Sequence, residues 1–159
     1  MATRITGGTL TVTITESLTM THSPSADNRT HSQTVTKTFA NIDQLNTRVL
    51  NLPNTNQVKV IDFGGTAASA PGTFLRSAVE YIRITNLDDT NGVAVILEDT
   101  GADTAAILVD PDSSLLLTDT QVEAFTNGSA FSGWSDIDEI FLKASAANVQ
   151  VEVVVATTA

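Results

Sequence analysis

Strict alternation of polar and apolar residues near the start of the chain limits what that segment can become. Over residues 9–15, threonine occupies every odd position, and the even positions are held by Leu10, Val12 and Ile14. Successive side chains of a β-strand point to opposite faces of the sheet. The segment is therefore predicted to be a strand with one apolar face and one face of hydroxyl groups.

The same parity continues beyond this segment, to Leu18 and Met20. An unbroken strand over residues 9–21 would be about 44 Å long at 3.4 Å per residue. Strands in compact domains are usually shorter than this. We therefore expect a bend or break near Glu16 and Ser17.

Further short strand patterns recur along the chain at intervals of roughly 10 to 15 residues. No amphipathic pattern of helical period persists for the length that a domain-forming helix needs. We expect residues 79–84 and 93–97 to form one hairpin, and residues 137–142 and 149–155 to form the last one. The other expected strands lie within residues 34–39, 58–63, 105–109 and 114–117.

These patterns predict an all-β fold with about nine or ten short strands. We expect one domain over residues 1–159, an antiparallel β-sandwich or jelly roll. The segment 22–33 has no large apolar side chain and is rich in Ser, Asn, Asp and Pro. It is expected to be an exposed loop or arm that proteases cut in the free protein.

The overall charge excludes several classes of partner. The chain has 159 residues, no cysteine and a formal net charge of -10. Phosphate groups would repel such a protein, so neither nucleic acid nor an anionic membrane surface is an expected partner. No signal peptide and no apolar run long enough to cross a bilayer is apparent, which leads us to expect a soluble protein.

The charges are unevenly placed along the sequence. Residues 1–85 hold seven basic and five acidic side chains, a sum of +2, whereas residues 86–159 hold one basic and thirteen acidic side chains, a sum of -12. If these halves separate in space, complementary patches would favour docking, with Arg29, Arg48 and Arg76 as the interface candidates. The alternative is a solvated acidic face that keeps the protein soluble.

Few residues suggest chemistry at a site. The only histidines, His22 and His31, border the apolar-poor segment, where catalytic geometry would be poorly held, so we expect no enzyme. Acidic turns such as that at Asp88 could gather around calcium, although none completes a calcium-loop pattern. We predict no metal site and no cofactor. Trp134 is expected to be a core or interface anchor, or, together with Tyr81, a platform for sugars.

Several segments resemble small structural proteins of the virions of tailed bacteriophages. They are residues 81–91 (YIRITNLDDTN), 93–97 (VAVIL), 10–18 (LTVTITESL), 112–117 (DSSLLL) and 137–155. The resemblance implies a β-sandwich present in many copies on the particle, either a decoration protein of the capsid or a component of the tail. It supplies no catalytic residues.

The expected function is therefore that of a non-enzymatic structural protein, a capsid decoration (cement) protein that bridges capsomers. We expect a homo-oligomer such as a trimer, which binds the major capsid protein or another virion protein. Its expected location is the virion, assembled in the host cytoplasm. The alternatives are a tail, tail-fibre or head–tail junction subunit, or a carbohydrate-binding module.

Overall fold

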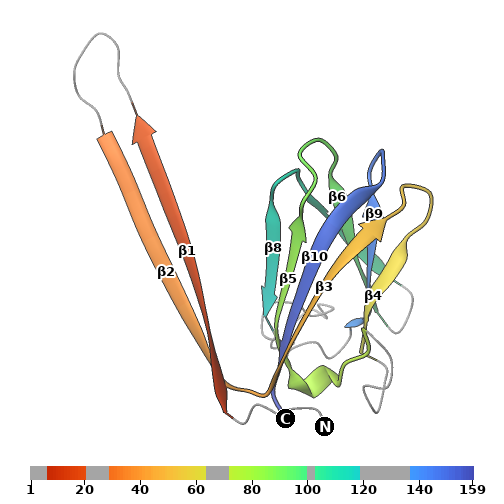
Figure 1. Ribbon diagram of the computed structural model, residues 1–159, viewed down its shortest axis with the longest axis horizontal. Coiled ribbons are helices and arrows are strands. Elements are labelled where there is room, and N and C mark those ends of the chain that lie inside the picture. Colours follow the sequence, from red (N-terminus) through yellow and green to blue (C-terminus); the bar gives the residue numbers. More distant parts are fainter. Residues whose placement is uncertain (1–6, 21–28, 64–71, 100–102, 119–136) are drawn as a thin grey trace.

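The computed structural model describes residues 7–20, 29–63, 72–99, 103–118 and 137–159. In these ranges the chain forms ten strands. Eight of them build a β-sandwich, and the first two form a separate hairpin that projects away from it (Figure 1). We call this hairpin the arm. It consists of β1 (Gly8–Met20) and β2 (Arg29–Ile42).

Two four-stranded antiparallel sheets make up the sandwich. The first has the order β3-β10-β5-β8 and the second the order β4-β9-β6-β7. The chain changes sheet at every connection from β3 onward except between β6 and β7, and the last strand pairs with β3, the first strand of the sandwich. This is the arrangement of a jelly roll. The prediction of an antiparallel, jelly-roll-like sandwich is confirmed.

The strands of the sandwich have the following bounds: β3 Gln44–Leu52, β4 Val58–Asp62, β5 Val79–Asn86, β6 Val93–Asp99, β7 Thr104–Val109, β8 Ser114–Thr118, β9 Ile137–Ala144 and β10 Val149–Thr157. A 3-10 turn lies at Arg76–Ala78.

The core lies between the two sheets and follows from alternation along their strands. β10 places four valines on the inner face, β5 adds Ile82 and Ile84, and the facing sheet contributes Val95 and Leu142, all buried. Residues of opposite parity on β5, among them Tyr81 and Arg83, lie on the outer face of the first sheet. This outer face is the one that the arm contacts.

The expected hairpin of residues 79–84 with 93–97 is wrong, as is the expected last hairpin. β5 pairs with β10 and β8, whereas β6 pairs with β9 and β7. The turn that follows β5 crosses from one sheet to the other. Buried Asn86 holds this crossing, because its side-chain amide donates to the carbonyls of Asn91 (2.8 Å) and Asp110 (3.1 Å). Turn residues in a sequence indicate where the chain changes direction. They do not determine whether the next strand pairs with the previous one in the same sheet or crosses to the opposite sheet.

The expected break near Glu16 is also wrong. Pairing runs without interruption from Leu10 opposite Phe39 to Met20 opposite Arg29, and the only irregularity lies between Gly8 and Leu10. The length limit applies to strands packed inside a compact body. β1 can exceed it because the arm leaves that body.

Part of the segment expected as an exposed loop or arm belongs to a strand. Residues 29–33 pair with β1 at the far end of the arm, and those whose side chains are described there are exposed. Residues 22–28 lie outside the described ranges. The arm joins the sandwich at Asn41, which adopts a positive φ of 60°, a backbone conformation that asparagine tolerates. Beyond it the backbone N–H of Asp43 donates to Thr157 O (2.9 Å), and β3 begins.

Candidate docking surface

The arm has two chemically different faces. On both of its strands hydroxyl residues alternate with residues of other kinds, and the pairing places the hydroxyl residues of β1 opposite those of β2. One face carries threonine and serine, as in the pairs Thr13–Thr36 and Ser17–Ser32. We call it the hydroxyl face. The other face carries the large apolar side chains and is called the apolar stripe. Its members are Leu10, Val12, Ile14, Leu18, Val35 and Phe39, interspersed with Glu16, His31, Gln33 and Lys37.

The base of the apolar stripe anchors the arm to the sandwich. Phe39 and Ile42 pack with Tyr81 and Ala156 of the outer face in a small buried cluster, separate from the main core. The rings of Phe39 and Tyr81 lie 5.6 Å apart, tilted by 54°, an ordinary geometry for an aromatic pair. Burial raises the pKa of the Tyr81 hydroxyl. The Lys37 ammonium lies 4.8 Å from the centre of the Phe39 ring, within cation–π distance.

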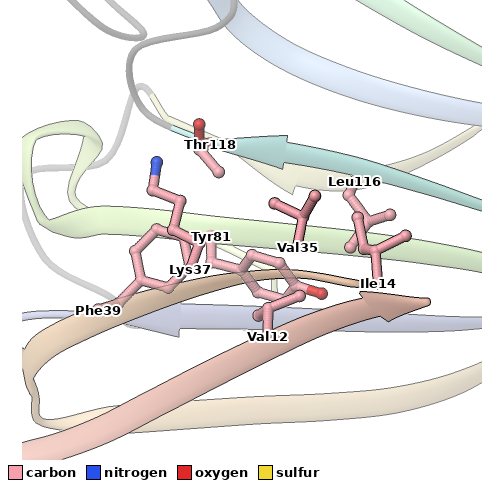
Figure 2. A pocket seen from close by; sticks show the side chains of 8 residues that line it. All are labelled: Val12, Ile14, Val35, Lys37, Phe39, Tyr81, Leu116 and Thr118. Carbon is pink, nitrogen blue, oxygen red and sulfur yellow. The ribbon is translucent and has the colours of Figure 1, made fainter. Parts of the chain in front are cut away.

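A crevice opens above this anchor, between the arm and the outer face of the sandwich. Its volume is about 330 Å³, and it is lined mainly by apolar side chains (Figure 2). The arm contributes Val12, Ile14, Val35, Lys37 and Phe39, and the sandwich contributes Tyr81, Leu116 and Thr118. Toward the tip of the arm, the arm and the sandwich diverge (Figure 1).

The upper part of the apolar stripe has no cover within the described chain. Ile14 is 47% exposed, Leu18 is 51% exposed and Val35 is 54% exposed. Single exposed apolar residues are common, but these three lie together on one face of a projecting element. A two-stranded hairpin is itself only marginally stable in water. The upper arm is therefore the strongest candidate for a surface that another molecule covers.

Sequence reasoning missed this surface, although a signal for it was present. Polar and apolar residues alternate both before and after residues 21–28. The two alternating segments pair with the same faces together, so that Ile14 lies opposite Val35 and Leu18 lies opposite His31. The alternation is harder to recognise in β2, because the polar residues His31 and Gln33 stand on the face that carries the apolar stripe. Comparing the two flanks of the polar segment would have predicted the hairpin.

Two of the predicted interface residues are engaged within the chain. The Arg48 guanidinium donates to Val60 O (2.7 Å) at the edge of the sandwich, and burial lowers its pKa. Arg76 forms an ion pair with Asp138. Their use in docking stays a prediction, and the structure gives each of them a role in holding the sandwich.

The remaining predicted residues are placed only in part. The backbone of Arg29 lies at the end of the arm, opposite Met20. His31 is exposed on β2. Trp134 and His22 lie outside the described residues. Tyr81, considered with Trp134 as a platform for sugars, is 5% exposed beneath Phe39. Its ring is therefore not free to stack on a sugar.

The two charge halves of the sequence do not separate within the sandwich. Strands of the first half alternate with strands of the second in the order β3-β10-β5-β8. Three bases of the first half pair with acids of the second half: Arg76 with Asp138, Arg83 with Glu152, and Lys59 with Glu139 (2.8 Å). Much of the complementarity seen in the sequence is therefore used inside one chain.

The acidic turn at Asp88 has a structural use. Its carboxylate accepts hydrogen bonds from the backbone N–H groups of Asn91 (2.6 Å) and Thr90 (2.9 Å). These bonds lower the pKa of Asp88, the bond from Asn91 most of all. In the ranges that the structure describes, no three acidic or histidine side chains gather as a possible metal site.

Comparisons with protein-family models, with curated proteins and with solved structures find no match. Among the described residues, no helix is long and apolar enough to span a bilayer.

Proposed function

We propose that the protein is a non-enzymatic structural subunit of a tailed-phage particle, a capsid decoration protein that bridges capsomers. The observation that carries the proposal is the arm. It extends about 44 Å along its 13-residue first strand, and the upper part of its apolar stripe, at Ile14, Leu18 and Val35, is uncovered. An element of this kind suits contact with a neighbouring molecule better than it suits chemistry at a closed site.

In this role the sandwich would sit on one capsomer while the arm reaches over the seam to the next. Full burial of an aliphatic side chain contributes about 1.5–3 kcal/mol. Ile14, Leu18 and Val35 are already half buried, so covering the rest would contribute on the order of 1 kcal/mol each. The gain per copy is small, and repetition over a particle multiplies it.

The fold is compatible with this role but does not select it. Jelly rolls occur in viral capsid proteins and in sugar-binding proteins alike, so function has to be argued from a site. The resemblance of the strand-and-turn segments to small virion proteins favours the first class. In the same direction, Tyr81, one of the two proposed sugar platforms, is buried under the arm.

The position on the particle can be tested with purified virions. Quantitative mass spectrometry and cryo-electron microscopy should find the chain at every capsomer seam. Density at a single vertex or along the tail would instead make it a junction or tail subunit. Absence of the chain from purified virions would refute a virion role altogether.

The role of the arm can be tested on particles that lack the protein. A variant with Ile14→Ser, Leu18→Ser and Val35→Ser should bind such particles at least tenfold more weakly than the unaltered chain. The matched control changes the hydroxyl face at the same height, with Thr13→Ser, Thr36→Ser and Thr15→Ser. Equal binding of the two variants would show that the apolar stripe does not dock.

A further inference from the structure

The arm also leaves its backbone edges open. Within the described chain, β1 and β2 pair only with each other, so each strand presents an outer row of N–H and C=O groups. Natural proteins usually protect such an edge with lysine, proline, a bulge or a covering element. β1 has none of these between Leu10 and Met20, and its only charged residue is Glu16.

The two edges of the arm are not equivalent. β2 carries Lys37, Arg29 and His31, which are residues of the type that discourages further strand pairing. β1 consists mainly of threonine with Leu, Val and Ile, the composition that favours strands. The β1 edge is therefore the better template for an added strand.

Contact through the apolar stripe alone would be small. The uncovered part, from Ile14 to Leu18, is about 17 Å long and about 10 Å wide across two strands. Two such faces packed together would bury roughly 340 Å², well below the 1,200 Å² or more of a specific stable interface. Pairing along an edge adds backbone hydrogen bonds over the whole length of the strand.

We propose that β1 pairs antiparallel with β1 of a second copy of this chain, about a two-fold axis at Ile14. Residues 9–19 of one copy then oppose residues 19–9 of the other, with about ten backbone hydrogen bonds. The arms become a four-stranded sheet in the order β2-β1-β1-β2. Three or more strands with an apolar face give the stability that a lone hairpin lacks.

The register centred on Ile14 matches the chemistry of both faces. On the apolar face, Leu10 lies opposite the partner's Leu18, and Ile14 lies opposite the partner's Ile14. On the other face every opposed pair consists of hydroxyl residues, as at Thr13 with the partner's Thr15. A two-fold axis perpendicular to the sheet keeps like faces together, so one continuous apolar surface results.

Charge also favours this register. Glu16 lies opposite the partner's Val12, and within each copy Val12 pairs with Lys37. The Glu16 carboxylate therefore stands two strands, or about 10 Å, from the partner's Lys37. Both side chains are long enough to approach each other over the intervening valine. The two Glu16 residues themselves lie on opposite sides of the axis, so that like charges are not opposed.

The inference concerns copies of this chain and does not rest on a virion role. Purified protein is sufficient to test it, and its failure would leave the particle experiments untouched. The contact is isologous and makes a dimer, whereas the sequence led us to expect a trimer.

Single cysteines give the most direct test, because the chain has none of its own. Under a mild oxidant, Ile14→Cys should form a disulfide-linked dimer, since directly opposed residues have Cα atoms about 4.5–5.5 Å apart. Val35→Cys is the matched control, since Val35 is similarly exposed on the same face. In the proposed sheet the two Val35 positions are about 14 Å apart, too far for a disulfide.

Each pattern of cross-linking decides between arrangements. Linking of Ile14→Cys alone supports the proposal. Linking of Val35→Cys alone would place the two-fold contact on β2, and linking of both variants would indicate packing of stripe on stripe. Either of these last two results, or the absence of any link, overturns the proposal.

The mass of the protein in solution gives a second, independent test. Ile14→Arg places two like charges opposite each other at the axis, so it should convert dimers into monomers and raise the dissociation constant at least tenfold. Val35→Arg should leave the dimer intact. Circular dichroism checks that the sandwich remains folded in both variants, since neither residue belongs to its core. A trimeric or monomeric unaltered protein would contradict the inference.

Discussion

Gly72 occupies a position that no other residue fits well. Its φ is +94°, and a Cβ there would lie 2.8 Å from Val60 O and 3.0 Å from Nη1 of Arg48. We expect Gly72→Ala to lower the free energy of unfolding by about 1–3 kcal/mol, through backbone strain and displacement of the Arg48 hydrogen bond. Urea unfolding followed by circular dichroism measures this.

Gly92 provides the control for that substitution. A Cβ there would lie 3.1 Å from Cδ1 of Leu108, the end of an exposed side chain that can move away. Its φ lies outside the left-handed region. Gly92→Ala should therefore change the free energy of unfolding by less than about 1 kcal/mol. Equal losses for the two variants would mean that the crowding at Gly72 is not what destabilises it.

Asp88 makes stability depend on pH. Its pKa is lowered in the folded protein by the hydrogen bonds that its carboxylate accepts. A lowered pKa contributes stability above the unfolded value of 3.8, and this contribution is lost as the pH falls through the folded pKa. The stability difference between the unaltered chain and Asp88→Asn should be larger at pH 6 than at pH 3.

Urea midpoints of the two proteins, measured across that pH range, test this prediction. The other carboxylates are common to both proteins, so their contribution cancels in the difference. A difference that does not vary with pH would show that the Asp88 carboxylate is not held by its turn in solution.

At the scale of elements, the arm is held at one place. Its base is fixed by the cluster of Phe39, Ile42, Tyr81 and Ala156, while Ile14, Leu18 and Val35 in its upper part are about half exposed. Phe39→Ala should therefore release the arm from the sandwich without unfolding the sandwich. The expected cost is about 1.5–3 kcal/mol of apolar burial at this contact.

Spin labels at Ser32→Cys on the arm and Asn51→Cys on β3 report the arm's position, since both residues are exposed. In Phe39→Ala the distribution of distances between the labels should broaden markedly. Thr38→Ala, which changes the neighbouring residue on the hydroxyl face, should leave it narrow. A narrow distribution in both variants would show that something other than the aromatic pair sets the arm's position.

At the scale of the whole molecule, ion pairs join basic residues of the first half of the sequence to acidic residues of the second half. We expect these pairs to contribute to the stability of the sandwich. Arg76→Glu should lower the free energy of unfolding by about 1 kcal/mol, because it replaces an ion pair with two like charges beside each other. The reversed pair, Arg76→Glu with Asp138→Arg, should recover most of that loss. Urea unfolding at low and high salt measures both.

Charge reversal at Arg48 and Arg76 does not test docking alone, because both residues hold the sandwich. Reversing Arg48 and Arg76 together would disturb a hydrogen bond to Val60 and the ion pair with Asp138. Slower binding of such a variant would report damage to the sandwich as readily as lost steering. If Arg76→Glu with Asp138→Arg does not restore the free energy of unfolding, loss of the Arg76–Asp138 ion pair is not the reason that Arg76→Glu destabilises the protein.

The sequence by itself determined which side chains share a face, because alternation along a strand is a local property. It predicted the alternating strand at residues 9–15 and the strand-rich sandwich. It could not determine which strands pair, because one turn pattern serves both a hairpin and a crossing between sheets. Only the tertiary structure placed β5 and β6 in opposite sheets and carried β1 out of the compact body. It also turned Arg48 and Arg76 toward partners distant in the sequence, and contacts of this kind depend on how separate segments pack.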